Sequence, residues 1–268
     1  MTMPARPWLS AAAGARRVRD LLVYCYPLAL VLLGWEALAR AGLVRPLFLP
    51  TVPSVMWQGM RLAREGQILG LLITSLFRAV AGLALAVAIG VMLGIAMTRL
   101  RPVRWLFDPL IAIGFPSPKI AFLPIFILWF GIDHLSKALI VAFTCVFPMV
   151  VSAYHGAAAV NQVWIWSARA MGTPERRLLW RVVLPASLPY LFTGLRVALP
   201  VALITAFTAE MVAGGGGLGA ALMFAQRFFE TPTVFVYLVL MLLTGFAFDK
   251  LMLDVRRRVI GWHEGEAG

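Results

Sequence analysis

Long apolar segments separated by shorter polar ones dominate the pattern of this sequence. A helix needs about 20 mostly apolar residues to cross the hydrocarbon core of a bilayer. Segments of about that length are Leu21–Ala39, Leu69–Met97, Ser136–Tyr154, Leu188–Val212 and Thr233–Lys250. Leu106–Phe130 is also apolar, but Gly114, Pro116 and Pro118 interrupt it, so we expect a broken span there. The pattern predicts an all-α integral membrane protein with about six transmembrane helices.

Polar segments divide the chain into a transmembrane unit, residues 21–258, and two short ends, residues 1–20 and 259–268. No small-residue cleavage site follows the first apolar run, so we interpret that run as an uncleaved span. Between the first two spans, Ser54–Arg64 has the pattern of a short amphipathic surface helix. Arginine and lysine are concentrated in residues 1–20, between residues 250 and 258, and in alternate connecting segments. The positive-inside rule therefore predicts that both termini are cytoplasmic.

Composition and charge narrow the class of protein. Hydrophobic residues make up 61% of the 268 residues and charged residues only 13%, so one soluble core could not bury the apolar surface. The net charge of +12 could indicate a nucleic-acid-binding protein. The basic residues cluster between apolar spans, however, and do not form the continuous basic face of a soluble DNA-binding domain. We expect membrane lipid, and no nucleic acid, around this chain.

The segment 161–189, here called the docking segment, is too long to be a simple connector between helices, which usually has about 2 to 8 residues. Asn161 suits the N-cap of a short helix, and Gly172 suits its C-terminal end because glycine enters the left-handed region without strain. Two interpretations fit this pattern. The segment either docks a cytoplasmic partner or lies on the membrane and binds lipid headgroups.

A second helix is predicted after Gly172. Thr173 would cap it, Pro174 would occupy its first position, and Pro185 would end it. Its apolar and basic residues fall on different faces: Leu178, Leu179, Val182 and Val183 on one, Arg176, Arg177 and Arg181 on the other. The docking segment would therefore be two short helices joined at a glycine.

Catalytic or metal-binding patterns are scarce. The histidines His134, His155 and His263 are far apart, without the spacing of a metal site. Cys25 and Cys145 lie in predicted spans and are interpreted as apolar core residues. We therefore expect no metal site and no enzymatic activity on this chain.

The glycine run 214–217 does not have the pattern of a phosphate-binding loop. Such a loop needs a lysine and a serine or threonine after its last glycine, and Ala220 and Ala221 follow Gly219 instead. If this protein pumps a solute, a separate ATPase must supply the energy.

Charged residues inside spans are the candidates for a transport pathway, because a charge in lipid is costly and usually faces a partner or water. Lys119, beside Ser117 in the broken span, could lower the entry barrier of an anionic solute. Glu210, near the end of the fifth span, could contact the pathway, but a structural ion pair with Arg78 or Arg196 is the favoured interpretation. Ser117, Lys119 and Glu210 are the candidate pathway residues.

The docking segment resembles the EAA loop of ABC-importer permeases. Ser167, Ala168, Gly172, Leu184 and Pro185 match the pattern of that loop, whereas Trp166 stands where its glutamate is usual. The similarity extends from about Pro50 to Arg258 and includes the following sequences: LPIFILWFGI (123–132), VVLPASLPYLFTGLRVAL (182–199) and AEMVAGGGGLG (209–219). These sequences are similar to the nitrate, sulfonate and taurine branch of the family.

The resemblance implies a type I ABC-importer permease fold in the bacterial inner membrane. It further implies a permease homodimer, two ATPase subunits that bind ATP and Mg²⁺, and an extracytoplasmic solute-binding protein. The residues that would contact the ATPase and couple it to transport are Ala168, Arg169, Met171, Gly172, Glu175 and Arg176. No cofactor is expected on this chain, and the solute would be a small anion such as a sulfonate, taurine, nitrate or carboxylate.

Two other classes remain as alternatives. An ion-gradient-driven secondary transporter would work without an ATPase, but no clear inverted repeat is present. A membrane-embedded enzyme would need clustered histidine or acidic residues at depth, and the sequence provides none.

Overall fold

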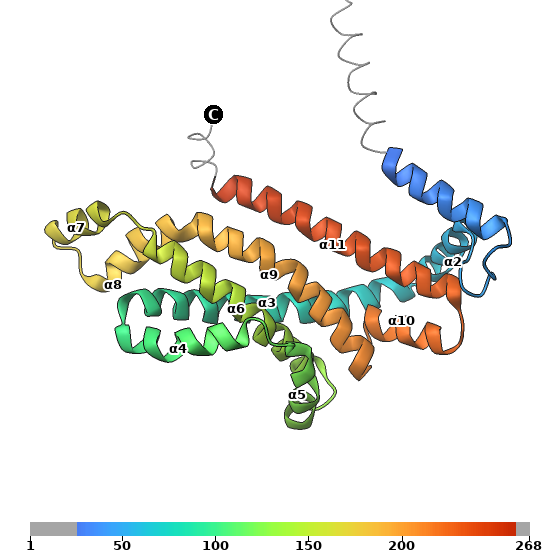
Figure 1. Cartoon of the computed structure of the whole chain (residues 1–268), viewed down its shortest axis with the longest axis horizontal. Helices are drawn as coiled ribbons and strands as arrows, with labels where there is room; N and C mark the ends of the chain where they lie inside the picture. The colour runs from blue at the N-terminus through green and yellow to red at the C-terminus, as the bar shows by residue number, and fades with distance from the viewer. Residues whose placement is uncertain (1–25, 261–268) are drawn as a thin grey trace, which may run out of the picture.

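The computed structural model describes residues 26–260, and this part of the chain is almost entirely helical (Figure 1). Residues 26–40 form a helix that continues the first predicted span, whose beginning lies outside the described residues, as do residues 1–20 and Cys25. The elements that follow are α2 (Val52–Arg64), α3 (Gln67–Arg99), α4 (Arg101–Gly114), the 3-10 turn η1 (Lys119–Phe122), α5 (Leu123–Phe130), α6 (His134–Ala158), α7 (Gln162–Ala170), α8 (Glu175–Leu178), the π turn η2 (Leu179–Val183), α9 (Leu184–Ala213), α10 (Leu218–Arg227) and α11 (Thr231–Val259).

The predicted spans are recognisable in this order of elements. Within the described residues, α3, α6, the helix that runs from Glu175 to Ala213, and α11 are long and apolar enough to cross a membrane. The predicted break is confirmed, because two helical parts, Arg101–Gly114 and Lys119–Phe130, meet there at an angle of 100°. Together they make a fifth span if they cross as one. The predicted amphipathic helix is confirmed as α2.

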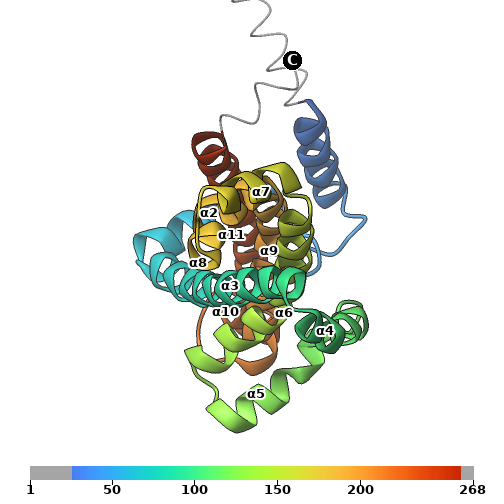
Figure 2. The ribbon, with the colours of Figure 1, turned by 90° about the vertical axis from the view of Figure 1, so that its left-hand side faces the viewer.

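The core of the molecule is a bundle of α3, α6 and α9, which lie against one another in both views (Figures 1 and 2). Small residues on α3 allow the close approach to α6. A Cβ on Gly90 would lie 2.5 Å from the Cβ of Met149, and one on Gly94 would lie 2.6 Å from the Cβ of Ala153. In a bilayer, helices associate through such close packing because lipid is as apolar as their side chains.

The two ends of the bundle carry the features that matter for function. α5 points away from the bundle, and the docking segment, which contains α7 and α8, lies at one end of it (Figures 1 and 2). The glycine run that precedes α10 lies at the other end (Figure 1).

Candidate functional site

The first half of the docking segment forms as predicted. The Asn161 side chain accepts a hydrogen bond from the Val163 amide at 2.9 Å and caps α7. Gly172 adopts the left-handed conformation, with φ +75°, directly after this helix. The Thr173 amide then donates to the Ala168 carbonyl at 3.0 Å, so the turn closes back on α7. The predicted helix and glycine turn are confirmed.

The second half differs from the prediction at both of its ends. Pro174, not Thr173, occupies the N-cap of α8, and no side chain caps it. Pro185 does not end the helix, because α8 continues through η2 directly into α9. We attribute this to the π turn before Pro185, which shifts the carbonyl register that the proline ring would otherwise meet. The second half of the docking segment and the fifth span therefore form one continuous helical stretch, Glu175–Ala213, here called the rod.

A small apolar core holds α7 against this rod. It consists of Ala157, Val160, Ile165, Ala168, Leu178 and Val183. Ala168 is 6% exposed and packs inside this core, whereas Met171 is 78% exposed. Of the two residues that we expected to make apolar contact with an ATPase, only Met171 presents its side chain to the outside. Ala168 instead stabilises the segment itself.

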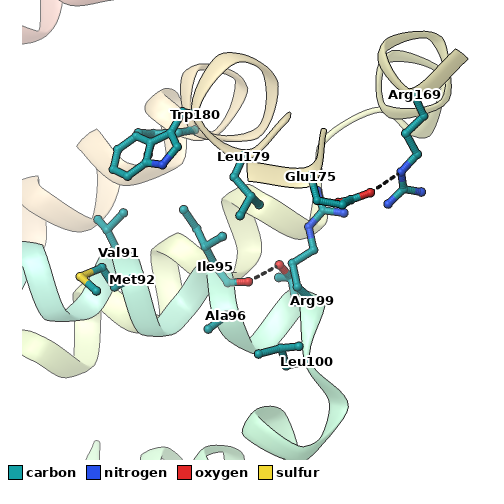
Figure 3. Close-up of a pocket in the computed structure, with 12 residues that line it drawn as sticks. Val91, Met92, Ile95, Ala96, Arg99, Leu100, Arg169, Glu175, Leu179 and Trp180 are labelled. Atoms are coloured by element: carbon teal, nitrogen blue, oxygen red, sulfur yellow. Dashed lines mark hydrogen bonds and ion pairs between the residues drawn. The ribbon is translucent and has the colours of Figure 1, made fainter. Parts of the chain in front are cut away.

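Three of the polar residues expected at the ATPase contact, Arg169, Glu175 and Arg176, lie on either side of Gly172 in the chain. The Arg169 Nε donates to the Glu175 Oε1 at 2.7 Å, and this ion pair bridges α7 and α8 across the glycine turn (Figure 3). Arg176 is exposed and makes no ion pair within the described residues. Trp166, at the position where the EAA loop usually has glutamate, is 62% exposed. The exposed surface of the docking segment is therefore both apolar, at Trp166 and Met171, and basic, at Arg176.

At the opposite end of the bundle, Glu210 and Arg78 form a buried ion pair. Their Oε1 and Nη1 atoms are 2.7 Å apart, and both side chains are at most 1% exposed. The Arg78 guanidinium also donates to the carbonyls of Gly215 and Gly216, each at 2.7 Å. The expected structural pairing of Glu210 with an arginine is thereby confirmed.

Further polar contacts complete this cluster, and sequence reasoning missed them. Ser75 donates to the Glu210 carboxylate at 2.8 Å and accepts from the Leu218 amide at 2.9 Å. The Arg78 Nε lies 3.2 Å from His134 Nδ1, and the fully buried Lys137 lies nearby, 3.4 Å from the Ile132 carbonyl. The sequence feature that could have indicated this cluster was the presence of charged residues within apolar spans.

Lys119 and Ser117 lie at the bend between α4 and α5. The Lys119 ammonium donates to the Phe115 carbonyl at 2.7 Å and lies 4.7 Å from the centre of the Phe147 ring. The Ser117 hydroxyl donates to the Ile113 carbonyl at 2.7 Å. Glu210 belongs to the other cluster, so the structure does not bring the three candidate pathway residues into one site.

Sequence comparisons with known proteins consistently match this chain to transport permease proteins. Residues 86–261 match the family described as "Binding-protein-dependent transport system inner membrane component". The chain is 34% identical to the taurine transport system permease protein TauC of Escherichia coli K12 over 88% of each chain. It is 28% identical to a putative aliphatic sulfonates transport permease protein, SsuC of Bacillus subtilis 168, over 90% of this chain and 87% of that protein.

Solved structures show the same fold. The MetNI methionine ABC transporter in an inward-facing conformation gives a TM-score of 0.56 at 17% identity, over 69% of this chain and 91% of that one. An amino acid ABC transporter gives a TM-score of 0.59 at 16% identity, over 71% of this chain and 92% of that one. At these identities the likeness concerns the fold alone.

Proposed function

Because this chain belongs to the family of binding-protein-dependent transport system inner membrane components, we propose that it forms the translocation pathway for a small sulfonate-type anion. The chain is a multi-pass permease subunit of an ABC importer in the bacterial inner membrane, and the ATPase of such an importer is a separate chain. The names of TauC and SsuC support the solute class.

The docking segment is the part that couples the ATPase to transport in this proposal. Two copies of the chain form the pathway, and each docking segment binds one ATPase subunit, which carries ATP and Mg²⁺. A solute-binding protein delivers the solute on the outer side. Met171, Arg169, Glu175 and Arg176 make the contacts, Gly172 sets the turn, and Ala168 holds the segment together.

One observation carries the coupling proposal: helical structure continues from Glu175 through the π turn η2 to Ala213. A displacement of the docking segment is therefore passed directly to the fifth span, because no loop separates the two. The 2.7 Å ion pair between Arg169 and Glu175 connects α7 to this rod, so α7 and the rod move together in the proposal. The pathway then alternates between outward and inward access.

Lys119 attracts the anion in this proposal. It lies at the break in the third span, where irregular backbone survives only beside protein or water. Ser117 supports the bend beside it, and Glu210 acts in the buried cluster and not on the solute. Both termini and the docking segment are cytoplasmic.

The experiment that tests this function is purification of the full-length chain from its native membrane, followed by solute uptake in liposomes. We expect an ATPase subunit with a G-x-x-x-x-G-K-[ST] loop to co-purify.

Gly172→Val should insert normally but uncouple ATP hydrolysis from uptake, because valine is strained at φ +75°. Lys119→Ala should raise the taurine concentration needed for half-maximal uptake.

The matched control is Gly66→Val, which introduces the same residue at φ +72° in a loop remote from the docking segment, with open space around it. This variant should remain coupled. Uptake by the purified chain without an ATPase would overturn the importer proposal, and normal coupling in Gly172→Val would overturn the role of the docking segment. If Lys119→Ala leaves the taurine concentration for half-maximal uptake unchanged, Lys119 does not contribute to the pathway.

A further inference from the structure

Two adjoining cavities of opposite character lie where the end of α3 meets the docking segment. The first, here called the apolar groove, has a volume of about 700 Å³ and separates α3 from η2 (Figure 3). Its walls are mainly Val91, Met92, Ile95, Leu179, Trp180 and Leu184. The second, here called the basic pocket, has a volume of about 330 Å³. Thr98 and Arg99 line both cavities, so the two are neighbours.

The basic pocket has the charge of an anion site. Arg99, Arg101 and Arg104 line it, together with Tyr154 and Gln162, and no acidic side chain does. Arg99 and Arg101 make no ion pair within residues 26–260, and the Arg104 guanidinium lies 5.3 Å from the centre of the Tyr154 ring. Guanidinium groups bind phosphate through paired hydrogen bonds, which makes phosphate the ligand that suits this pocket.

The acidic group nearest the apolar groove does not cancel this charge. Glu175 lines the groove, and its carboxylate is paired with Arg169 at 2.7 Å and faces Arg99 (Figure 3), so one carboxylate stands against four arginines that line the two cavities. The combined site therefore keeps an excess of positive charge at the boundary between the two cavities. Anionic lipids accumulate at basic pockets between transmembrane helices for this reason.

The position along α3 matches the boundary between acyl chains and headgroups. α3 has 33 residues and is roughly 50 Å long at 1.5 Å per residue, which exceeds the roughly 30 Å hydrocarbon core. This length allows the basic end to lie among the headgroups while Val91 and Met92 lie at acyl depth. Trp180 is 71% exposed beside the groove, and tryptophan is enriched at this interface.

We propose that this composite site binds an anionic phospholipid, with the phosphate in the basic pocket and one acyl chain in the apolar groove. The groove has α3 on one side and Leu179 and Trp180 of η2 on the other. A lipid bound there contacts both the core helix and the rod that carries the docking segment. Arg169 and Glu175 also line the groove, so the lipid site borders the proposed ATPase contact, whereas Lys119, the candidate solute residue, lines neither cavity.

Native mass spectrometry of the full-length chain, titrated with phosphatidylglycerol and separately with phosphatidylcholine, tests the proposal. We expect retention of phosphatidylglycerol and little retention of phosphatidylcholine. Arg99→Gln should weaken phosphatidylglycerol binding about fivefold, the effect of one basic side chain at an anionic surface. The matched control is Arg257→Gln, an exposed arginine of α11 that lines neither cavity and should leave retention unchanged.

A second variant separates the acyl chain from the phosphate. Ala96→Phe fills part of the apolar groove without changing charge and should also reduce phosphatidylglycerol retention. Inorganic phosphate in millimolar excess should not displace the lipid, because it has no chain for the groove. Equal retention of both lipids, no effect of Arg99→Gln, wild-type retention by Ala96→Phe, or displacement by inorganic phosphate would each overturn the proposal.

Discussion

At the scale of single residues, the buried pair of Arg78 and Glu210 determines how the end of the bundle opposite the docking segment is built. Isolated charges at this burial would be very unfavourable, so the pair exists only because each group is satisfied. Glu210 accepts from Ser75, Arg78 and the Gly219 amide, and Arg78 donates to two carbonyls of the glycine run. The cluster therefore joins α3, α9 and the start of α10.

Removing one partner of this pair should strongly destabilise the fold. Glu210→Gln leaves the Arg78 charge buried without its counter-charge, and we expect a loss of about 3 kcal/mol in the free energy of unfolding. Equilibrium unfolding in mixed micelles measures it. The control is Glu65→Gln, which breaks the exposed pair with Arg61 and should cost less than about 1 kcal/mol. Equal stability of the two variants would contradict this account.

At the scale of elements, the packing of α3 against α6 depends on glycines that leave no room for a side chain. The hypothetical Cβ of Gly90 meets the Met149 side chain, and that of Gly82 lies 2.5 Å from the Ala138 carbonyl oxygen. Gly70, on the same helix, has no atom within 4 Å of such a Cβ. Two glycines of one helix should therefore respond oppositely to the same substitution.

Gly90→Ala should destabilise the protein by about 1–3 kcal/mol, because the added methyl group forces α3 away from α6. Gly70→Ala should be neutral or stabilise by up to about 1 kcal/mol, since alanine favours the helix and meets nothing. Thermal unfolding of the two variants side by side measures the difference. A loss of stability in Gly70→Ala, or none in Gly90→Ala, would argue against this packing.

At the scale of the whole molecule, the charges and the fold together predict one orientation in the membrane. The basic ends of α3 and α11 and the docking segment gather at one end of the molecule, and the buried ion-pair cluster lies at the other (Figure 1). Loops rich in arginine and lysine remain in the cytoplasm. The docking segment would thus face the compartment that contains ATP.

Cysteine labelling tests this orientation. In a chain without its native cysteines, we expect Glu65→Cys to react with a membrane-impermeant maleimide in intact spheroplasts. Arg257→Cys should react only after lysis, because the positive-inside rule places it in the cytoplasm. The opposite labelling pattern would show that the molecule is inserted the other way.

Sequence patterns were sufficient to predict the long apolar helices, the break after Gly114, the Asn161 cap and the Gly172 turn. These features depend on local preferences and on hydrophobic length, which are properties of short segments. The folded structure was needed to see that the helix continues through Pro185, since the effect of a proline depends on the helical register before it. It also decided which arginine pairs with Glu210 and that Ala168 faces inward, because such contacts join residues far apart in the chain or depend on how its segments pack.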